Sequence, residues 1–247
     1  MSLKGTLAVV VGGSRGLGRG AVEALAARGA GVVVVGRDAS SLAALAGEVK
    51  GTIPVAGDAS DERLAERVLR EHDPDLVVVC AGAVPVMRAF HELTWDEFQV
   101  NWQADAKIAF GWLRHALRRP MKRGSHVIVI SSGAAIQGSP VSGSYASAKR
   151  AQWFMAEYAA TEIGRADLGL RVHCVLPMLN ASTALGREGI AAYAERAGVS
   201  AQEFAKRFDP PLTTAIFGAA IADLAEDPDR WPQRAYRLAG TGLSAVP

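Results

Sequence analysis

The sequence predicts an α/β fold with a doubly wound, open parallel sheet, and three observations support this prediction. Short apolar runs rich in valine alternate with alanine-rich stretches of helical period. The runs are apolar throughout, which is typical of strands buried on both faces of a parallel sheet. The chain has 247 residues, of which 49% are hydrophobic and 21% charged, so it can bury a large core. Regular strand-helix alternation then favours helices on both faces of the sheet.

The predicted elements alternate from the first residues onward. The strands are Leu7–Val11, Val32–Val35, Thr52–Ala56, Leu76–Cys80, Val127–Ile130 and Leu170–Val175. The helices are Gly16–Arg28, Ser40–Lys50, Ser60–His72, Thr94–Arg119, Ser144–Ile163 and Leu212–Ala225. No repeat or flexible linker interrupts them, so residues 1–247 are interpreted as one domain. The least regular part, about residues 178–211, follows a late strand, and we expect it over the ligand crevice as a substrate loop.

Composition excludes several classes of protein. The net charge is only +2 and the apolar fraction is high, which excludes disorder and argues against a general nucleic-acid binder. No apolar run approaches the ~18 residues that a membrane span needs, and the start of the chain resembles a strand rather than a signal peptide. Cys80 and Cys174 form no C-x-x-C pair, so neither a disulfide scaffold nor a cysteine metal site is expected. We therefore expect a reduced, cytoplasmic protein.

A glycine-rich loop, Gly-Gly-Ser-Arg-Gly-Leu-Gly, occupies residues 12–18 between the first strand and the first helix. Missing side chains let the backbone approach a pyrophosphate, and the following helix N-terminus offers free N–H groups. The spacing fits G-x-x-x-G-x-G better than G-x-G-x-x-G, and no Lys-Ser/Thr pair follows as in a P-loop. The alternative is a glycine-rich turn without a ligand. The position of the glycine motif directly after the first strand favours a site for a dinucleotide coenzyme.

The end of the second strand bears on which coenzyme binds. NAD enzymes of this architecture place an acid there to hold the ribose hydroxyls, whereas this chain has Gly36 followed by Arg37. Together with Arg15 of the glycine loop, Arg37 suits the 2′-phosphate of NADP(H), because guanidinium groups bind phosphate through charge-assisted hydrogen bonds. The alternative is two solvated arginines. Asp58, after the third strand, could accept from the adenine amino group or serve as a turn residue or helix N-cap.

Tyr145 and Lys149 stand at positions i and i+4 and therefore share a helix face. A nearby cation favours the phenolate, so we expect Lys149 to lower the pKa of Tyr145 toward working pH and to make it a general acid/base. Ser132, just beyond the strand that ends at Ile130, could hold a substrate oxygen beside Tyr145. Taken singly, each feature is weak, because a Y-x-x-x-K pair is common by chance and a serine at a strand end is often a turn residue.

Taken together, these residues resemble the classical short-chain dehydrogenase/reductases over essentially the whole chain. The resemblance rests on Gly12, Gly16, Gly18, Asp58, Ala81, Gly82, Asn101, Ser132, Tyr145 and Lys149. It implies a Rossmann-type sheet of seven strands and an NADP(H)-dependent enzyme that moves a hydride between nicotinamide and a small or medium carbonyl or alcohol. Such chemistry needs no metal. The family's long helices also build subunit contacts, which implies a homodimer or homotetramer.

The resemblance also implies roles for individual residues. Tyr145 would pass the proton, Lys149 would bind the nicotinamide ribose, Ser132 would orient the substrate oxygen, and Asn101 would fix a water of the proton relay. The residues expected at the coenzyme, from their chemistry and from the resemblance, are Gly12, Ser14, Arg15, Gly16, Leu17, Gly18, Arg37, Asp58, Ala59, Ala81, Gly82, Tyr145, Lys149 and Pro177.

Two departures from the family pattern leave an alternative open. Val79-Cys80 stands where the family has two asparagines that brace the central sheet, and Met178 stands where it has glycine after Pro177. We expect Met178 to face the nicotinamide end of the crevice. The alternative is a non-catalytic nucleotide-binding or regulatory protein on the same fold. An epimerase or dehydratase is a third interpretation, but its usual G-x-x-G-x-x-G loop and separate sugar domain are not seen.

Overall fold

The computed structural model describes residues 3–118 and 121–246. Its strands form one eight-stranded sheet in the order β3-β2-β1-β4-β5-β6-β7-β8. They are β1 (Leu7–Val11), β2 (Gly31–Gly36), β3 (Thr52–Ala56), β4 (Leu76–Val79), β5 (His126–Ile130), β6 (Arg171–Pro177), β7 (Ala235–Ala239) and β8 (Gly242–Ala245). The first seven are parallel, whereas β8 returns antiparallel to β7. The predicted parallel sheet is confirmed, with one strand more than the seven expected.

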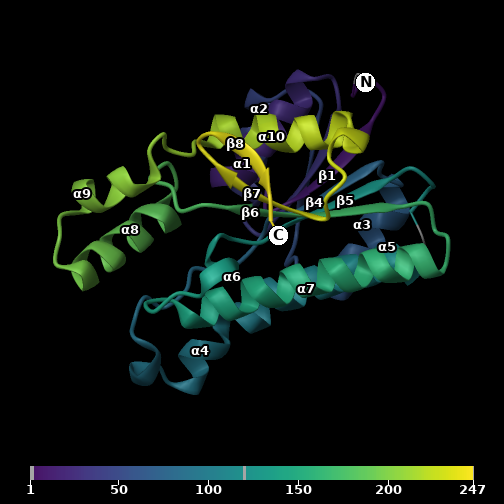
Figure 1. Ribbon diagram of the computed structural model, residues 1–247. Helices are drawn as coiled ribbons and strands as arrows, with labels where there is room; N and C mark the ends of the chain where they lie inside the picture. The colour runs from purple at the N-terminus through teal and green to yellow at the C-terminus, as the bar shows by residue number, and fades with distance from the viewer. Residues whose placement is uncertain (1–2, 119–120, 247) are drawn as a thin grey trace.

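Helices cover both faces of this sheet (Figure 1). The α-helices are α1 (Gly16–Ala27), α2 (Ala39–Glu48), α3 (Glu62–His72), α4 (Trp95–Asn101), α5 (Lys107–Arg118), α6 (Ala134–Gln137), α7 (Gly143–Arg165), α8 (Ala184–Ala197), α9 (Ala201–Ala205) and α10 (Thr214–Glu226). A π-helical turn, η2 (Trp102–Ala106), joins α4 to α5, and three 3-10 turns are η1 (Phe90–Glu92), η3 (Lys206–Phe208) and η4 (Pro228–Arg230). None of the helices in the described residues is both long and apolar enough to span a membrane.

Each valine run serves two cores, because alternate side chains of a strand point to opposite faces. Val9 and Val11 pack under the layer of α3, α5 and α7. Val10 and Val34 pack under the layer of α1, α2 and α10. This two-sided burial explains why the runs are apolar at every position.

The strand order reverses beside β1, because β2 and β3 lie on one side of it and β4 on the other. At such a switch point, ligands bind beyond the carboxyl ends of the strands. In Figure 1, α8 and α9 project from the same end of the sheet as α4 and α6. The glycine loop and the residues that follow β4, β5 and β6 therefore meet at this edge.

Two predicted segments differ from the structure. The single helix expected over Thr94–Arg119 is divided into α4, η2 and α5, and Arg119 itself lies outside the described residues. The segment 178–211, predicted to be the least regular, instead contains two helices. The Thr183 side chain caps α8 by accepting from the Gly186 N–H at 3.0 Å, and Gly198 ends it with a φ of +65°. These are ordinary helix boundaries.

Helices α1 and α10 touch backbone to backbone at two glycines. A Cβ on Gly218 of α10 would lie 2.1 Å from the Gly20 carbonyl oxygen of α1. A Cβ on Gly20 would lie 2.3 Å from the carbonyl oxygen of Thr214. No real side chain tolerates such distances, so glycine at both positions sets how closely α10 lies against the helix that follows the glycine loop.

We therefore expect Gly218→Ala to lower the free energy of unfolding by about 1–3 kcal/mol, the usual cost of overpacking. The matched control is Gly47→Ala in α2, where an added Cβ meets nothing within 4 Å. It should raise stability by about 0.5–1 kcal/mol, because alanine is the better helix former. Chemical denaturation of both variants measures the difference. Equal stability of the two would contradict the close crossing of α1 and α10.

Candidate active site

The four predicted catalytic residues lie at the carboxyl edge of the sheet. Ser132 follows β5, Tyr145 and Lys149 lie in the first two turns of α7, and Asn101 is the last residue of α4. The Ser132 hydroxyl is within hydrogen-bonding reach of the Tyr145 phenol. The Asn101 amide reaches the same side-chain cluster through Asp105, to which it donates at 3.1 Å. The structure thus brings together residues that are up to 48 positions apart in the sequence.

Lys149 is almost fully buried, with 4% of its surface exposed. Its ammonium Nζ donates to the Ile130 carbonyl oxygen at 3.1 Å and lies 3.0 Å from the Asp105 carboxylate. Nζ is also 5.4 Å from the centroid of the Tyr145 ring. Burial by itself would lower the pKa of Lys149, but the charges around it, Asp105 above all, outweigh burial and raise it. Lys149 therefore stays an ammonium ion, with one of its three donors still available.

The pKa of Tyr145 moves in the direction opposite to the one expected. Burial of the half-buried phenol raises it above the ordinary value of 10.0. Lys149 and the hydrogen bond with Ser132 act to lower it, as the sequence predicted, but Asp105 opposes them and the net shift is upward. The expected lowering toward working pH is therefore wrong for this structure. At neutral pH this direction of the pKa keeps Tyr145 in its phenol form.

Asp105 is a site residue that the sequence reasoning missed. Its side chain is completely buried, and its Oδ2 accepts from the Ala83 backbone N–H at 2.9 Å and from Asn101 Nδ2 at 3.1 Å. Its position four residues after Asn101 was the available signal, because residues at i and i+4 share a helix face. The residues on either side of Asp105 are both alanine. An acid buried in such surroundings needs a cation as its partner.

The glycine loop forms a cradle that side chains would fill. Gly12 has a φ of +82°, and a Cβ there would lie 2.6 Å from the Ala81 Cα after β4. A Cβ on Gly18 would lie 2.1 Å from the Gly12 carbonyl oxygen. Helix α1 begins at Gly16, and Arg15 provides no side-chain cap for it. The N–H groups of its first turn are therefore directed toward the loop, as a pyrophosphate requires, so these residues fit a dinucleotide.

Arg15 and Arg37 are both exposed, and within the described residues the guanidinium group of neither one makes a hydrogen bond or a close ion pair. Next to Arg37 is Gly36, where a Cβ would approach only the Leu42 side chain and the Ser14 hydroxyl, at 3.4 Å or more. The next acid, Asp38, is occupied as the cap of α2. It accepts from the backbone of Ser40 and from two serine hydroxyls, which together hold its pKa down at about 2.

Asp58 is a turn residue, which was one of the alternatives to an adenine contact. Its carboxylate accepts from the Ser60 backbone N–H at 2.9 Å, and this hydrogen bond is the main cause of its lowered pKa. It is not the helix cap, because Asp61 caps α3. The carboxylate is exposed at the carboxyl edge of the sheet, and Arg37 contributes to lowering its pKa.

The remaining predicted coenzyme residues lie along the same edge, and Met178 lies among them. Pro177 ends β6 and accepts from the Gly133 N–H at 2.8 Å. A Cβ on Gly133 would lie 2.6 Å from the Met178 sulfur. The thioether of Met178 therefore covers Gly133, the residue next to Ser132, and is half-buried. The other members of the predicted set are Leu17 at the start of α1, Ala59 after β3, and Ala81 and Gly82 after β4.

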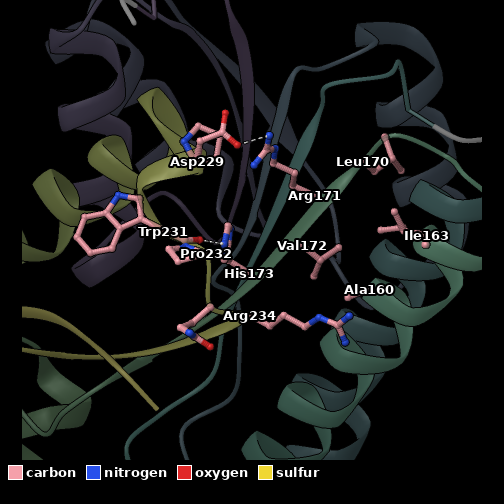
Figure 2. A pocket seen from close by; sticks show the side chains of 13 residues that line it. Ala160, Ile163, Leu170, Arg171, Val172, His173, Asp229, Trp231, Pro232 and Arg234 are labelled. Carbon is pink, nitrogen blue, oxygen red and sulfur yellow. Dashed lines mark hydrogen bonds and ion pairs between the residues drawn. The ribbon is translucent and has the colours of Figure 1, made fainter. Parts of the chain in front are cut away.

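A separate hollow of about 330 Å³ lies at the opposite edge of the sheet (Figure 2). It is bounded by the end of α7, the start of β6 and the turn η4. Several of its polar groups pair within the chain, since Arg171 lies 2.7 Å from Asp229 and His173 Nε2 lies 2.9 Å from the Trp231 carbonyl oxygen. Among the residues that the structure describes, no cluster of metal-ligating side chains occurs here or elsewhere. The four predicted catalytic residues all lie at the carboxyl edge, away from this hollow.

Residues 6–191 match the model of the family described as short chain dehydrogenase. The chain belongs to the short-chain dehydrogenase family. One relative is carbonyl reductase (NADPH) 2 of Sus scrofa, 31% identical over 189 residues, or 76% of each chain. Human L-xylulose reductase is 30% identical over 71% of this chain and 72% of its own length. The NADP-dependent (R)-specific alcohol dehydrogenase of Lentilactobacillus kefiri is 29% identical over 71% of this chain and 73% of its own.

Proposed function

We propose that this protein is an NADP(H)-dependent oxidoreductase that reduces a small or medium carbonyl to an alcohol, with Tyr145 as the proton donor. The observation that carries the proposal is that both the Ser132 hydroxyl and the Lys149 ammonium lie close to Tyr145. Membership of the short-chain dehydrogenase family supports it. So do the names of relatives that are NADPH or NADP-dependent enzymes of carbonyls and alcohols.

A bound nicotinamide coenzyme supplies the hydride, which adds to the carbonyl carbon. The chain's own residues handle the oxygen. Ser132 donates a hydrogen bond to the substrate oxygen and orients it toward Tyr145. As the C=O π bond breaks, the oxygen takes the phenolic proton of Tyr145, which leaves a phenolate that regains its proton from solvent. Lys149 stabilises that phenolate and uses its remaining N–H for the nicotinamide ribose.

The raised pKa of Tyr145 affects the rates of carbonyl reduction and alcohol oxidation differently at neutral pH. Carbonyl reduction needs the phenol, which is the form present. Alcohol oxidation needs the phenolate, which is scarce until the pH passes the tyrosine pKa. The rate of reduction should therefore stay level through neutral pH, whereas the rate of oxidation should rise as the pH rises.

Coenzyme and substrate are assigned to neighbouring parts of the edge. The glycine loop and the first turn of α1 hold the pyrophosphate, and Arg15 and Arg37 hold the 2′-phosphate of NADP(H). Residues 178–211, with α8 and α9, form the substrate side of this single domain. Met178 lines the passage between the two parts, because its sulfur lies over Gly133.

The proposed assembly is a homodimer or homotetramer through α5 and α7. Four large aromatic side chains lie exposed across these two helices and the adjoining turn η2, around a hollow of about 460 Å³, namely Trp102, Phe110, Phe154 and Tyr158. An apolar patch of this kind is typical of a protein–protein contact, and a second copy of the chain would cover it. A cytoplasmic location is also proposed, supported by the two free cysteines.

The first prediction concerns catalysis. Tyr145→Phe should lower turnover by roughly 100- to 10,000-fold, the usual contribution of a general acid, and should leave coenzyme affinity nearly unchanged. Lys149→Ala should lower both, because Lys149 contacts the ribose as well as Tyr145. Steady-state rates on a carbonyl panel, followed by the absorbance of the reduced coenzyme, together with coenzyme titrations, measure these effects. Coenzyme binding without turnover in the unmodified protein would favour the non-catalytic alternative.

The second prediction concerns coenzyme choice. A hydrogen bond to a charged group contributes about 1.5–3 kcal/mol, so loss of one 2′-phosphate contact should weaken binding roughly 10- to 100-fold. NADPH should bind that much more tightly than NADH, and added salt should narrow the gap. Gly36→Asp with Arg37→Val should reverse the preference, because the new carboxylate accepts from ribose hydroxyls and repels the phosphate. Equal affinities for both coenzymes in the unmodified protein would show that the arginines are only surface charges.

The third prediction concerns substrate range. Met178→Gly should widen the pocket beside Ser132 and admit bulkier carbonyls, because a flexible thioether now fills that space. Met178→Leu is the matched control, since it keeps the volume and should leave the range unchanged. The ratio of kcat/KM for a bulky and a small carbonyl compares them. An identical ratio in all three proteins would place Met178 outside the substrate path.

The fourth prediction concerns assembly. Phe154→Asp should convert the oligomer to monomers, because a carboxylate at the centre of the contact would lose its water. The control is Ile53→Asp on the edge strand β3, where the side chain is similarly exposed but lies outside the proposed contact. Light scattering after size-exclusion chromatography gives the molar masses. A monomeric unmodified protein, or an oligomer that survives Phe154→Asp, would contradict the proposed interface.

A further inference from the structure

A complete ion pair lies inside the protein beneath the candidate active site. The Asp105 side chain is fully buried and Lys149 has 4% of its surface exposed. Their charged atoms, Oδ1 and Nζ, lie 3.0 Å apart. An isolated charge cannot be buried at low cost, so each of these groups needs the other. In the described residues, Oδ1 has no partner besides this ammonium.

Asp105 is held in place from several elements at once. Its Oδ2 accepts from Ala83, in the segment after β4, and from Asn101, at the end of α4. Its backbone carbonyl accepts from Gln152 Nε2 of α7 at 2.7 Å. Gly82 makes room for the carboxylate, because a Cβ there would lie 2.5 Å from Oδ1. Since the position of the carboxylate is fixed so tightly, the position of the ammonium that pairs with it is fixed as well.

The π-helical turn explains how an acid reaches this position. Asp105 lies in η2, between α4 and α5, where the helix is wider than an α-helix. Such turns change the direction in which side chains leave a helix and occur often at functional sites. Here the turn lies directly after Asn101 and carries an acidic side chain toward α7.

We propose that Asp105 is a positioning residue for proton transfer, which fixes the Lys149 ammonium beside the Tyr145 ring and offsets part of the positive charge that this ammonium presents to Tyr145. This inference rests on the proposed function of the same site. Asp105 is completely buried and acts through Lys149. Asp105 also links the segment after β4 to α7, the helix that carries Tyr145 and Lys149. In that segment Cys80 replaces an asparagine of the family pattern.

The charged and titratable groups that act on Tyr145 come from three elements. Lys149 lies on α7, Asp105 on η2, and Cys80 directly after β4. Burial raises the pKa of the Cys80 thiol to about 11, so that it is neutral at physiological pH. The balance at neutral pH is therefore between the Lys149 cation and the Asp105 anion. Removal of the anion alone leaves the cation to favour the phenolate.

The variant that tests this balance is Asp105→Asn, which keeps the shape of the side chain and an oxygen for the Ala83 N–H. Tyrosinate difference absorbance against pH, minus the same curve for a Tyr145→Phe protein in each background, isolates Tyr145. We expect Tyr145 to ionise at lower pH in the variant than in the unmodified protein. The alkaline loss of carbonyl reduction should move to lower pH by the same amount. Asp96→Asn is the control, because Asp96 is an exposed acid on the adjoining helix α4.

The absorbance titration needs no enzyme activity, so it separates this inference from the proposed function. A downward shift without turnover on any carbonyl would keep the role of Asp105 and remove the oxidoreductase. Active Asp105→Asn protein with an unchanged Tyr145 titration would overturn the role of Asp105 and keep the oxidoreductase. A purely structural role would lower stability in the variant and leave the pH dependence where it was.

A double variant keeps the inference testable if Asp105→Asn does not fold. Lys149→Met removes the cation, and the combination with Asp105→Asn removes both charges at once. Because an unpaired buried charge destabilises more than the loss of the whole pair, the double variant should melt at a higher temperature than either single variant. If Lys149→Met folds while both proteins that carry Asp105→Asn fail to fold, Asp105 braces the segment after β4 independently of Lys149, and the inference is wrong.

Discussion

The Lys149 ammonium and the Asp105 carboxylate lie 3.0 Å apart, and both are almost completely withdrawn from water. Removal of one partner of such a pair typically destabilises a protein by about 3–5 kcal/mol, because the other is left as a buried charge. Around this pair the structure gathers the end of β5 through Ile130, the turn η2, the segment after β4 and the first turns of α7. The geometry of the candidate site depends on it.

The coenzyme side of the site depends on a different constraint, the close approach of backbone segments. Gly12 lies against Ala81, and Gly18 lies against Gly12, at distances that no side chain would permit. These contacts close the loop against the end of β4 and leave the first turn of α1 facing outward. Backbone packing thus shapes the glycine loop where a pyrophosphate is proposed to bind, whereas charge shapes the candidate proton-transfer site around Tyr145. Both constraints, backbone packing and charge, act at Gly82, which must lack a side chain because the Asp105 carboxylate occupies the space.

Patterns of local sequence predicted much of this structure. The solid valine runs identify buried parallel strands, and the glycine loop after the first of them lies at the carboxyl edge of the sheet, as expected. The hairpin of β7 and β8 was missed because Arg237 and the small residues of β8 interrupt the apolar pattern. The break at η2 was missed because residues 94–118 keep a helical period throughout, and the turn there is set by tertiary contacts of Asn101 and Asp105.

The electrostatics of the site could not be predicted from spacing alone. The i, i+4 relation of Tyr145 and Lys149 correctly indicates a cation near the phenol. The direction of the pKa of Tyr145 depends also on its burial and on Asp105, 40 positions away in the sequence. Neither can be inferred from the Y-x-x-x-K motif. In the same way, only the structure shows that Asp38 caps a helix, with its carboxylate bound by the side chains of Ser40 and Ser41.

The most direct test of this account is the pH dependence of kcat for carbonyl reduction by the unmodified protein with saturating NADPH. If Tyr145 is a phenol whose burial raises its pKa, kcat should stay constant through neutral pH. It should fall only when the pH passes the ordinary tyrosine value of about 10. A decline of kcat near neutral pH would mean that the proton donor has a low pKa. That result would contradict both the protonation state assigned to Tyr145 and the electrostatic balance around it.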